Sequence, residues 1–380
     1  MSGPLSGLRF VEFVGIGPGP LAATLLSDLG AEVIRIDRLT ASDIGIARPL
    51  DYDFAARGRA SVAVDLKAPE AVALVLDLIA GADGLLEGFR PGVMERLGLG
   101  PEVCLARNPR LAYGRVTGWG QDGPLAQTAG HDLTYLALTG VLNAIGRPGT
   151  PPVPPVNLLG DYAGGSLFLV IGLLSAILSA RRTGAGQVID AAITDGVNFL
   201  ALPMAGLRAA GLSPGGRGEN LLDGGAPHYD SYICADGGYL AIAPIESRFR
   251  RTLLEGLGFD PASFPDVTDR STWPEARRLL AERIATRPRD DWARIFEGTD
   301  ACAAPVLDFD EAARHPHMLA RGATVEVGGI PQPAAAPRFS QTPPATPTPP
   351  RPRGSGAEAL TGWGIDPERL ARLRTRGILG

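Results

Sequence analysis

Residues 11–38, VEFVGIGPGPLAATLLSDLGAEVIRIDR, decide the fold, because they run from an apolar strand through a glycine turn into a helix and back into a strand. This is the order of a dinucleotide-binding βαβ unit, in which glycines let backbone amides approach an anionic ligand at a helix N-terminus. The third glycine is missing, and Pro18 and Pro20 each remove one amide donor. The stretch therefore predicts a βαβ unit but supports NAD(P) only weakly.

Cations follow the predicted strands. Asp37 stands where an acid would bind the ribose of NAD, but the adjacent Arg38 suits a ligand with an extra phosphate or an adenine face to stack on. Further arginines lie at the predicted C-terminal ends of strands or after them, the edge at which open α/β sheets bind ligands: Arg57, Arg59, Arg90 and Arg96. Any one of them is more often a solvated side chain, but together they predict a ligand with several phosphates and an adenine.

Bulk composition excludes several classes of protein. The chain has 380 residues, a length that suggests two domains, and its net charge of −5 provides no basic field for nucleic acid or an anionic membrane. Cys104, Cys234 and Cys302 fit neither a disulfide framework nor a C-x-x-C metal site, so we expect a reducing, cytoplasmic setting and no metal. The most apolar run, residues 166–180, is too short to span a bilayer and predicts a buried core helix.

Short β-type and helical segments alternate from residue 8 to about 117, which predicts a Rossmann-like parallel sheet with crossover helices. We expect a large α/β domain over residues 1–210. Within 225–325, a hairpin turning at residues 236–238 and three helical segments predict a smaller α+β domain. Nine prolines in residues 331–353 predict an extended strap, so that 326–380 returns to the large domain through a last amphipathic helix.

Two histidines are candidates for chemistry. His131 and Asp132 open a predicted helix on which Tyr135 lies one turn later on the same face. A helix N-terminus disfavours the imidazolium form, so His131 is expected to be neutral and able to accept a proton. His228 follows a proline in a predicted loop and is either structural or part of a cleft.

Two acids are open to more than one interpretation. Asp161 precedes the long apolar helix, where an aspartate is a preferred N-cap. The small residues around it, Gly160 and residues 163–165, would equally leave space for a substrate. Glu246 follows the second hairpin strand and is a surface charge, a helix cap or a functional group. The local sequence does not separate these interpretations.

Several stretches together resemble the α-methylacyl-CoA racemases, a branch of the class III CoA-transferase (CaiB/BaiF) family. They are the opening βαβ unit, EGFRPGVMERLGLGPE, GRVTGWGQDGPLAQTAGHDLTYLALTGVLNAIGR, NLLGDYAGGSLFLVIG, GQVIDAAITDG and LDGGAPHYDSYICADGGYLAI. The resemblance covers almost the whole chain. The whole family shares the opening turn and the Gly-Asp at Asp161, whereas the Gly-His-Asp at His131 is typical of the racemases, because transferases usually have an aromatic residue there.

The resemblance implies that the opening unit binds CoA rather than NAD, with CoA as part of the substrate and no added cofactor. It assigns the catalytic groups to His131 and Asp161, with Glu246 orienting His131, although the sequence PIES around Glu246 departs from the family's form. It also implies a set of CoA-binding residues, of which the last two line the pantetheine path: Ile16, Arg38, Val64, Lys67, Leu85, Arg90, Arg96, Asp132 and Tyr135.

The implied reaction is inversion at C2 of a 2-methylacyl-CoA thioester through a planar enolate, with His131 and Asp161 moving the proton on opposite faces. We expect the backbone amide of Asp161 to donate to the enolate oxygen. The alternative is CoA transfer with Asp161 as nucleophile, which does not need His131. A CoA-binding module without catalysis would need neither residue. The resemblance further implies an interlocked homodimer, around which the proline-rich strap wraps.

Overall fold

The computed structural model describes residues 2–40 and 45–380. Contacts along the chain divide these residues into two units. The first unit comprises the described residues of 1–139, 156–200 and 320–380, and the second comprises 140–155 and 201–319. This division differs from the contiguous ranges expected from the sequence, because residues 140–155 and 201–210 group with the second unit and residues 320–325 with the first. The sequence does not reveal this division, because the local sequence pattern does not change where the chain leaves one unit and later re-enters it.

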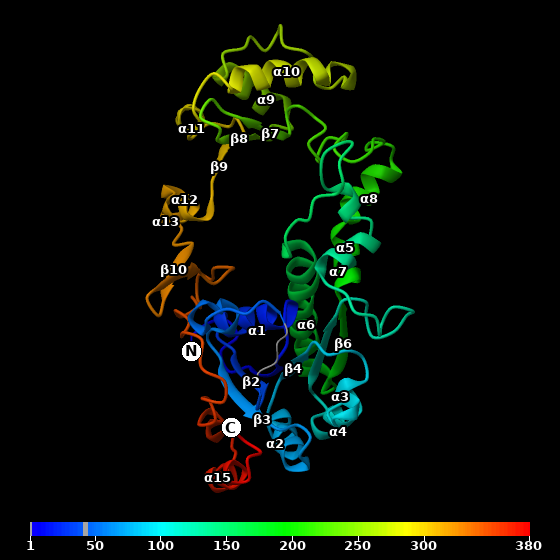
Figure 1. Ribbon diagram of the computed structural model, residues 1–380, viewed down its shortest axis with the longest axis vertical. Helices are drawn as coiled ribbons and strands as arrows, with labels where there is room; N and C mark the ends of the chain where they lie inside the picture. Colours follow the sequence, from blue (N-terminus) through cyan, green and yellow to red (C-terminus); the bar gives the residue numbers. More distant parts are fainter. Residues whose placement is uncertain (1, 41–44) are drawn as a thin grey trace. The chain divides into compact units, whose positions relative to one another are not determined.

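A six-stranded parallel sheet organises the first unit, in the order β3-β2-β1-β4-β5-β6 (Figure 1). This mixed α/β architecture confirms the predicted fold class. The order reverses between β1 and β4, whose C-terminal ends therefore flank the crevice in which open α/β sheets bind ligands. The strands are β1 (Arg9–Phe13), β2 (Glu32–Arg38), β3 (Ala60–Val64), β4 (Gly84–Glu87), β5 (Ala112–Thr117) and β6 (Gln187–Ala192).

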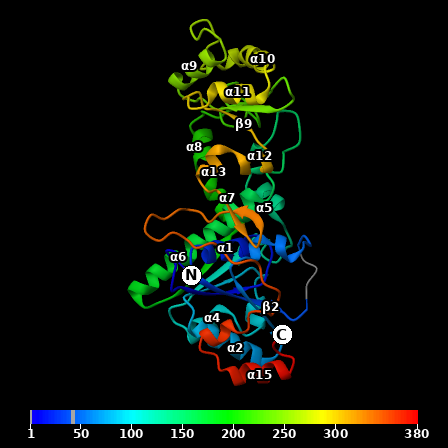
Figure 2. The same ribbon diagram turned by 90° about the vertical axis from the view of Figure 1, so that its left-hand side faces the viewer.

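Helices cover both faces of this sheet, because successive strand residues point to opposite sides and both sides are apolar. On one face, α1 (Pro18–Asp28) and α6 (Phe168–Thr183) pack their buried leucines around Phe10. On the other face lie α2 (Pro69–Ala80), α3 (Val93–Arg96), α4 (Pro101–Arg107), α14 (Ala359–Gly362) and α15 (Pro367–Thr375). Leu373 of α15 shares one apolar cluster with Leu74 of α2, and Figure 2 shows these two helices near each other.

The C-terminal segment is anchored on the first unit. After the hairpin β10 (Thr324–Val327) and β11 (Ile330–Pro333), the proline-rich residues adopt no helix up to α14. Gln332 is buried and accepts a hydrogen bond from Arg57 at 3.0 Å. The last residues cover the edge of β3, where Gly380 N–H donates to the Ala63 carbonyl at 2.9 Å. This protects an edge strand that would otherwise expose unpaired backbone groups. Short 3₁₀ helices at Leu50–Tyr52 and Phe54–Ala56 complete the unit.

The long apolar helix is longer than the sequence predicts. A π-helix, η4 (Leu158–Leu167), continues into α6 and gives 26 helical residues, long and apolar enough to cross a membrane by length and composition. The prediction that the run is too short is therefore wrong, because it omitted residues 158–165. Half of the most apolar part is buried within the protein, and α6 packs on β5 and β6.

The second unit contains a three-stranded antiparallel sheet, β7 (Asp230–Ile233), β8 (Tyr239–Ile242) and β9 (Ala303–Val306). The first two strands form the predicted hairpin, whereas β9 was not predicted, because AAPV contains a proline and no alternation. Trp292, Leu280 and Leu253 form an apolar core between sheet and helices. The helices are α8 (Leu202–Ala209), α9 (Ser247–Gly256), α10 (Trp273–Ile284), α11 (Arg289–Phe296), α12 (Phe309–Arg314) and α13 (Pro316–Ala320), with 3₁₀ helices at Leu142–Ala144 and Arg270–Thr272.

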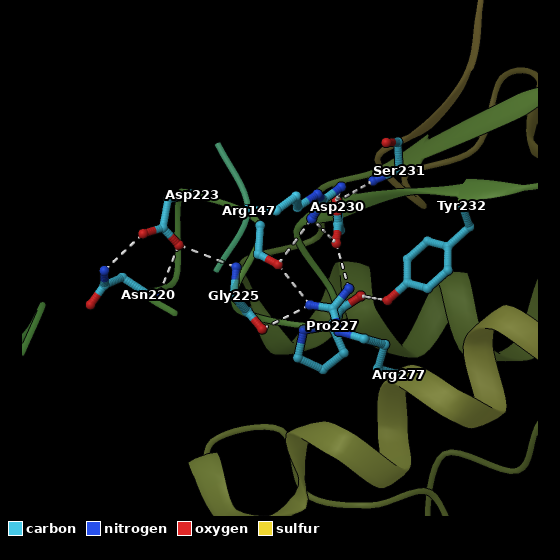
Figure 3. Close-up of polar contacts among 10 residues, drawn as sticks. Arg147, Asn220, Asp223, Gly225, Pro227, Asp230, Ser231, Tyr232 and Arg277 are labelled. Atoms are coloured by element: carbon cyan, nitrogen blue, oxygen red, sulfur yellow. Dashed lines mark hydrogen bonds and ion pairs between the residues drawn. The ribbon is translucent and has the colours of Figure 1, made fainter. Parts of the chain in front are cut away.

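A polar network around Asp230 holds the loop that enters β7 (Figure 3). Arg147 donates to both carboxylate oxygens of Asp230, at 2.6 and 2.7 Å, and Arg277 of α10 donates to one of them. The hydroxyl of Tyr232 donates to the Pro227 carbonyl at 2.5 Å. Burial alone would raise the pKa of Asp230, but the hydrogen bonds from the two arginines outweigh burial and lower it.

Candidate active site

The opening glycine turn meets the carboxylate of Asp161. Gly17 is the N-cap of α1 and has a φ of +65°, which favours glycine. A Cβ atom at Gly17 would lie 3.1 Å from Asp161 Oδ2. Pro18 and Pro20 occupy the first turn of α1, so the predicted loss of two amide donors is confirmed. We predicted that this glycine turn would let an anionic ligand approach, and the turn instead lies against a carboxylate of the protein itself.

Asp161 belongs to the π-helix η4, a conformation that is rare and often found at functional sites. The N-cap interpretation is wrong, because Asp161 lies inside the helical segment. The neighbouring glycines permit close packing rather than space for a substrate. A Cβ atom at Gly165 would lie 2.9 Å from Pro18 Cβ, and one at Gly164 would lie 2.6 Å from Val197 Cγ2 in α7 (Ile193–Leu200). These contacts hold η4 between α1 and α7.

Asp132, the first residue of α5 (Asp132–Leu138), anchors this turn of η4. The amide of Asp161 donates to Asp132 Oδ1 at 2.6 Å, and the amide of Gly160 donates to the same carboxylate. A Cβ atom at Gly160 would lie 2.3 Å from Asp132 Oδ1. Asp132 is 6% exposed, and its Oδ2 has no partner among residues 2–40 and 45–380. The expectation that the Asp161 amide serves an enolate oxygen is therefore wrong, because Asp132 already accepts its hydrogen bond.

The surroundings of Asp161 stabilise its protonated form. Burial is the largest influence and raises the pKa of Asp161, and the charge of Asp132 raises it further. A hydrogen bond from Asn157 Nδ2 at 3.4 Å and the charge of His131 act in the opposite direction but are weaker. The net pKa is raised, so Asp161 holds a proton to higher pH than an ordinary aspartate does.

His131 is the N-cap residue of α5 and is exposed. The Thr134 hydroxyl accepts from the His131 amide at 3.0 Å and donates to its carbonyl at 2.7 Å, which fixes the start of the helix. His131 directly precedes Asp132, whose carboxylate accepts from the Asp161 amide, so His131 and Asp161 belong to one site. The site therefore combines an imidazole and a partly buried carboxyl group.

Tyr135 lies one turn further along α5 and is buried. Its ring packs edge to face on Trp119 with centroids 4.8 Å apart, and its hydroxyl donates to the Gly130 carbonyl. Burial, followed by the charge of Asp161, raises the pKa of Tyr135 to about 12, whereas Arg90 acts in the opposite direction. Tyr135 is therefore a neutral phenol at neutral pH.

Exposed cations stand at the C-terminal edge of the sheet, as expected for a ligand with phosphates. Arg38 ends β2, Lys67 follows β3, Arg90 follows β4, and Arg96 ends α3. Ile16, in the opening turn, is 43% exposed and is available to a ligand.

Four residues of the implied CoA site are buried, namely Val64, Leu85, Asp132 and Tyr135. Val64 is 2% exposed and Leu85 is 0% exposed, and both belong to the apolar core. Val64 and Leu85 offer a ligand almost no accessible surface in this structure, and their contact with the nucleotide stays a prediction.

Two of the five arginines predicted to face a ligand with phosphates have structural roles instead. Arg57 is buried and pairs with Asp28 of α1 at 2.6 Å. Arg59 is buried and pairs with Glu12 of β1 at 2.9 Å. They precede β3 rather than follow it. The prediction that they face a ligand is wrong, because buried carboxylates far away in the sequence neutralise them.

Glu246 belongs to the second unit, where it is the exposed N-cap residue of α9 and makes no cap hydrogen bond through its side chain. Its role beside His131 stays a prediction.

Sequence reasoning missed Asn157 and Trp119, which contact Asp161 and Tyr135, because neither stands in a spacing that suggests chemistry. Within the described parts of the chain, no group of three or more His, Cys, Asp or Glu could hold a metal ion.

Comparison with known proteins agrees with the motifs and the geometry. Residues 5–356 match the model of CoA-transferase family III. The chain is 41% identical over 379 residues to alpha-methylacyl-CoA racemase of Mus musculus, covering 99% of this chain and 97% of that protein. It is 43% identical over 321 residues to the Homo sapiens protein of that name, covering 84% and 82%. A CAIB/BAIF family protein from Brucella suis has the same fold, with a TM-score of 0.82, 28% identity and coverage of 96% of this chain and 100% of that one. The chain belongs to CoA-transferase family III.

Proposed function

We propose that this protein inverts C2 of 2-methylacyl-CoA thioesters by transferring a proton through an enolate. The observation that carries the proposal is the hydrogen bond from the Asp161 amide of η4 to the carboxylate of Asp132, which brings His131, the preceding residue, into the same site at the start of α5. Inversion requires one group to remove the proton from one face of the enolate and a second group to deliver a proton to the other face. The racemases that the chain resembles at 41% and 43% identity support this reaction.

His131 and Asp161 are the proposed acid–base pair. The raised pKa of Asp161 makes its carboxyl group a better proton donor and acceptor near neutral pH than an ordinary aspartate would be. His131 is exposed at the N-terminal end of α5, where its imidazole is available to a ligand. Each group would return to its starting protonation state after the reaction in the opposite direction. Glu246 is proposed to orient His131.

The enolate oxygen also needs a hydrogen-bond donor, since acid–base groups alone cannot make a thioester C–H labile. The Asp161 amide is engaged by Asp132 Oδ1. The amides of Asp132 and Leu133 remain, because they lie in the first turn of α5, whose amides have no acceptor within the helix. We assign the donor role to this turn. Backbone donors of this kind contribute about 10²–10³ in rate.

CoA is proposed to bind at the C-terminal edge of the sheet. Arg38, Lys67, Arg90 and Arg96 supply exposed positive charge for its phosphates and a guanidinium plane for its adenine. Ile16 lies in the turn that leads to Gly17 and Asp161, so a ligand following this turn passes from the cations to the acid–base pair. Asp132 and Tyr135 would line the pantetheine path. The reaction uses only side chains and backbone amides, so no added cofactor is proposed.

A homodimer is the proposed assembly. Leu167, Ile171 and Leu178 recur on one side of η4 and α6 and are 46%, 58% and 69% exposed. Apolar stripes of this kind are typical of protein interfaces, and a second copy of the chain would cover them.

We further propose a cytoplasmic location, because Cys104, Cys234 and Cys302 are all free. No nucleic acid or membrane partner is proposed.

The test is proton NMR of the protein with one epimer of a 2-methylacyl-CoA in D₂O, beside the His131→Ala variant. Exchange at C2 with inversion, reduced at least about 100-fold in the variant, is the expected result. The competing activity is CoA transfer, in which Asp161 attacks the acyl-CoA and His131 is dispensable. Movement of CoA to an added carboxylate, without exchange at C2 and unaffected by His131→Ala, would replace the proposed reaction with that one.

A further inference from the structure

The second unit contains a cavity of about 310 Å³ that the proposed reaction does not use. All of its walls belong to this unit: the loop before β7, residues 247–254 of α9, residues 261–267 and α10. The volume falls at the lower end of the range of small-molecule sites, about 300–1,000 Å³. The cavity therefore suits a ligand of modest size.

One wall is His228, which is 6% exposed and whose Nδ1 has no partner in the described part of the chain. Burial, followed by the charge of Arg250, lowers the pKa of His228 to about 4, so the ring is neutral at neutral pH. A buried nitrogen without a partner is costly, which points to a hydrogen-bonding group that the ring can still receive. A half-turn of the ring exchanges Nδ1 with Cδ2, so a ligand can select the orientation.

The loop that carries His228 is firmly held. Tyr232 donates to the Pro227 carbonyl at 2.5 Å (Figure 3). The Tyr229 amide donates to the Ala226 carbonyl at 3.1 Å. Both neighbours of His228 are therefore fixed by hydrogen bonds. The position of His228 in the cavity wall is preorganised, which lowers the entropic cost of binding.

Another wall is positively charged. Arg250 and Arg251 line the cavity beside Ser247, the first residue of α9, and this helix begins without a side-chain cap. Free amides at a helix N-terminus favour an anion. Asp266 is the acid in the lining, and one of its oxygens already accepts from the amide and hydroxyl of Thr268. With two arginines against one engaged carboxylate, the local charge favours an anionic group.

The remaining walls are apolar. Leu253 and Leu280 are 2% and 1% exposed, Val267 is 9% exposed, and Phe264 adds an aromatic ring. An inorganic anion would leave this surface without a partner, whereas an organic anion would cover it. We propose that this cavity binds a small organic monocarboxylate, with its apolar body against Leu253 and Phe264 and its carboxylate against Arg251 and His228. The proposal does not depend on the function assigned to the first unit.

The test uses the full-length protein and 3-phenylpropionate as the probe, with calorimetric titration and ligand-observed NMR. Saturable binding at millimolar concentration is expected. Arg251→Gln and His228→Phe should each weaken binding about tenfold, because each removes a hydrogen bond to a charged group. The neutral alcohol 3-phenylpropanol should bind more weakly than the acid by a similar factor.

Arg248→Gln is the matched control, since Arg248 is an exposed arginine of the same helix that lies over Phe249 and does not line the cavity. It should bind like the unaltered protein, and so should His131→Ala, which separates this cavity from the acyl-CoA site. The proposal is overturned if binding does not saturate, if the alcohol binds as well as the acid, or if Arg248→Gln weakens binding as much as Arg251→Gln. Loss of binding in His131→Ala alone would also overturn it.

Discussion

Asp161 and Asp230 are both carboxylates removed from water, yet their surroundings shift their pKa values in opposite directions. Asp161 in the first unit has another carboxylate, Asp132, as its strongest charged neighbour, and its pKa is raised. Asp230 in the second unit accepts hydrogen bonds from Arg147 and Arg277, and its pKa is lowered. Burial raises the pKa of both, so the identity of the partners decides the outcome.

The difference separates a carboxylate that suits proton transfer from one that suits structural support. A group that keeps its proton to higher pH can both take and return a proton, whereas a carboxylate paired with arginines is an anion at all ordinary pH values. The two regions also differ in how they hold the side chain. Contact with Gly17 and the hydrogen bond from the Asp161 amide to Asp132 position Asp161, whereas salt bridges position Asp230.

The Asp161→Asn variant should have the largest effect on activity. The substitution keeps the size of the side chain and removes its proton chemistry, so exchange at C2 of a 2-methylacyl-CoA in D₂O should fall by about 10²–10⁴. Stability should be unchanged or slightly higher, because the repulsion between Asp161 and Asp132 disappears. Proton NMR and urea unfolding measure the two quantities. Exchange at the unaltered rate would remove Asp161 from the proposed acid–base pair.

Gly17→Ala should have the next largest effect on activity. The new Cβ atom would lie 3.1 Å from Asp161 Oδ2, and a φ of +65° costs a non-glycine residue about 1–2 kcal/mol. A small displacement of the carboxylate should reduce the exchange rate by up to about 10²-fold. Gly19→Ala is the control, since its Cβ atom would meet only Val116 Cγ1 at 3.9 Å. Equal activity in the two variants would contradict a positioning role for Gly17.

Asp230→Asn should act on stability rather than chemistry. Arg277 and Arg147 would lose their charged partner, but both are partly exposed to solvent, so the expected loss is about 1–3 kcal/mol. Because the folded pKa of Asp230 is lowered, its contribution is present above the unfolded pKa of about 3.9 and is lost as pH falls through the folded value. The difference in free energy of unfolding between the variant and the unaltered protein should therefore become smaller in acid. The free energy of unfolding in urea, measured for both proteins from about pH 3 to about pH 7, tests this. A difference between the two proteins that grows in acid would refute it.

Asp132→Asn is the smallest and most specific change. Asparagine can still accept the hydrogen bond from the Asp161 amide, but it lacks the charge that raises the pKa of Asp161. The acid limb of the kcat/KM profile should therefore move to lower pH. Asp122→Asn removes an exposed carboxylate that does not influence Asp161, and its profile should stay in place. A shift in both variants would indicate a general charge effect rather than the contact with Asp132.

The sequence alone predicted the parallel sheet, the hairpin of the second unit and the neighbourhood of His131, Asp132 and Tyr135. These features depend on local periodicity, which alternation of strands and helices or a spacing of three to four residues expresses directly. The exposed Arg38 and Arg90 at the edge of the sheet were found in the same way, since a residue that follows a parallel strand must emerge at that edge.

Only the tertiary structure decided the details of the site. It places Gly17 against Asp161, gives the amide of Asp161 to Asp132, and buries Arg59 against Glu12. Each of these contacts joins segments tens of residues apart or more, and the choice of partner depends on how α1, α5 and η4 pack together. Periodicity records which face of an element is buried, but it does not record which side chain of another element will meet that face.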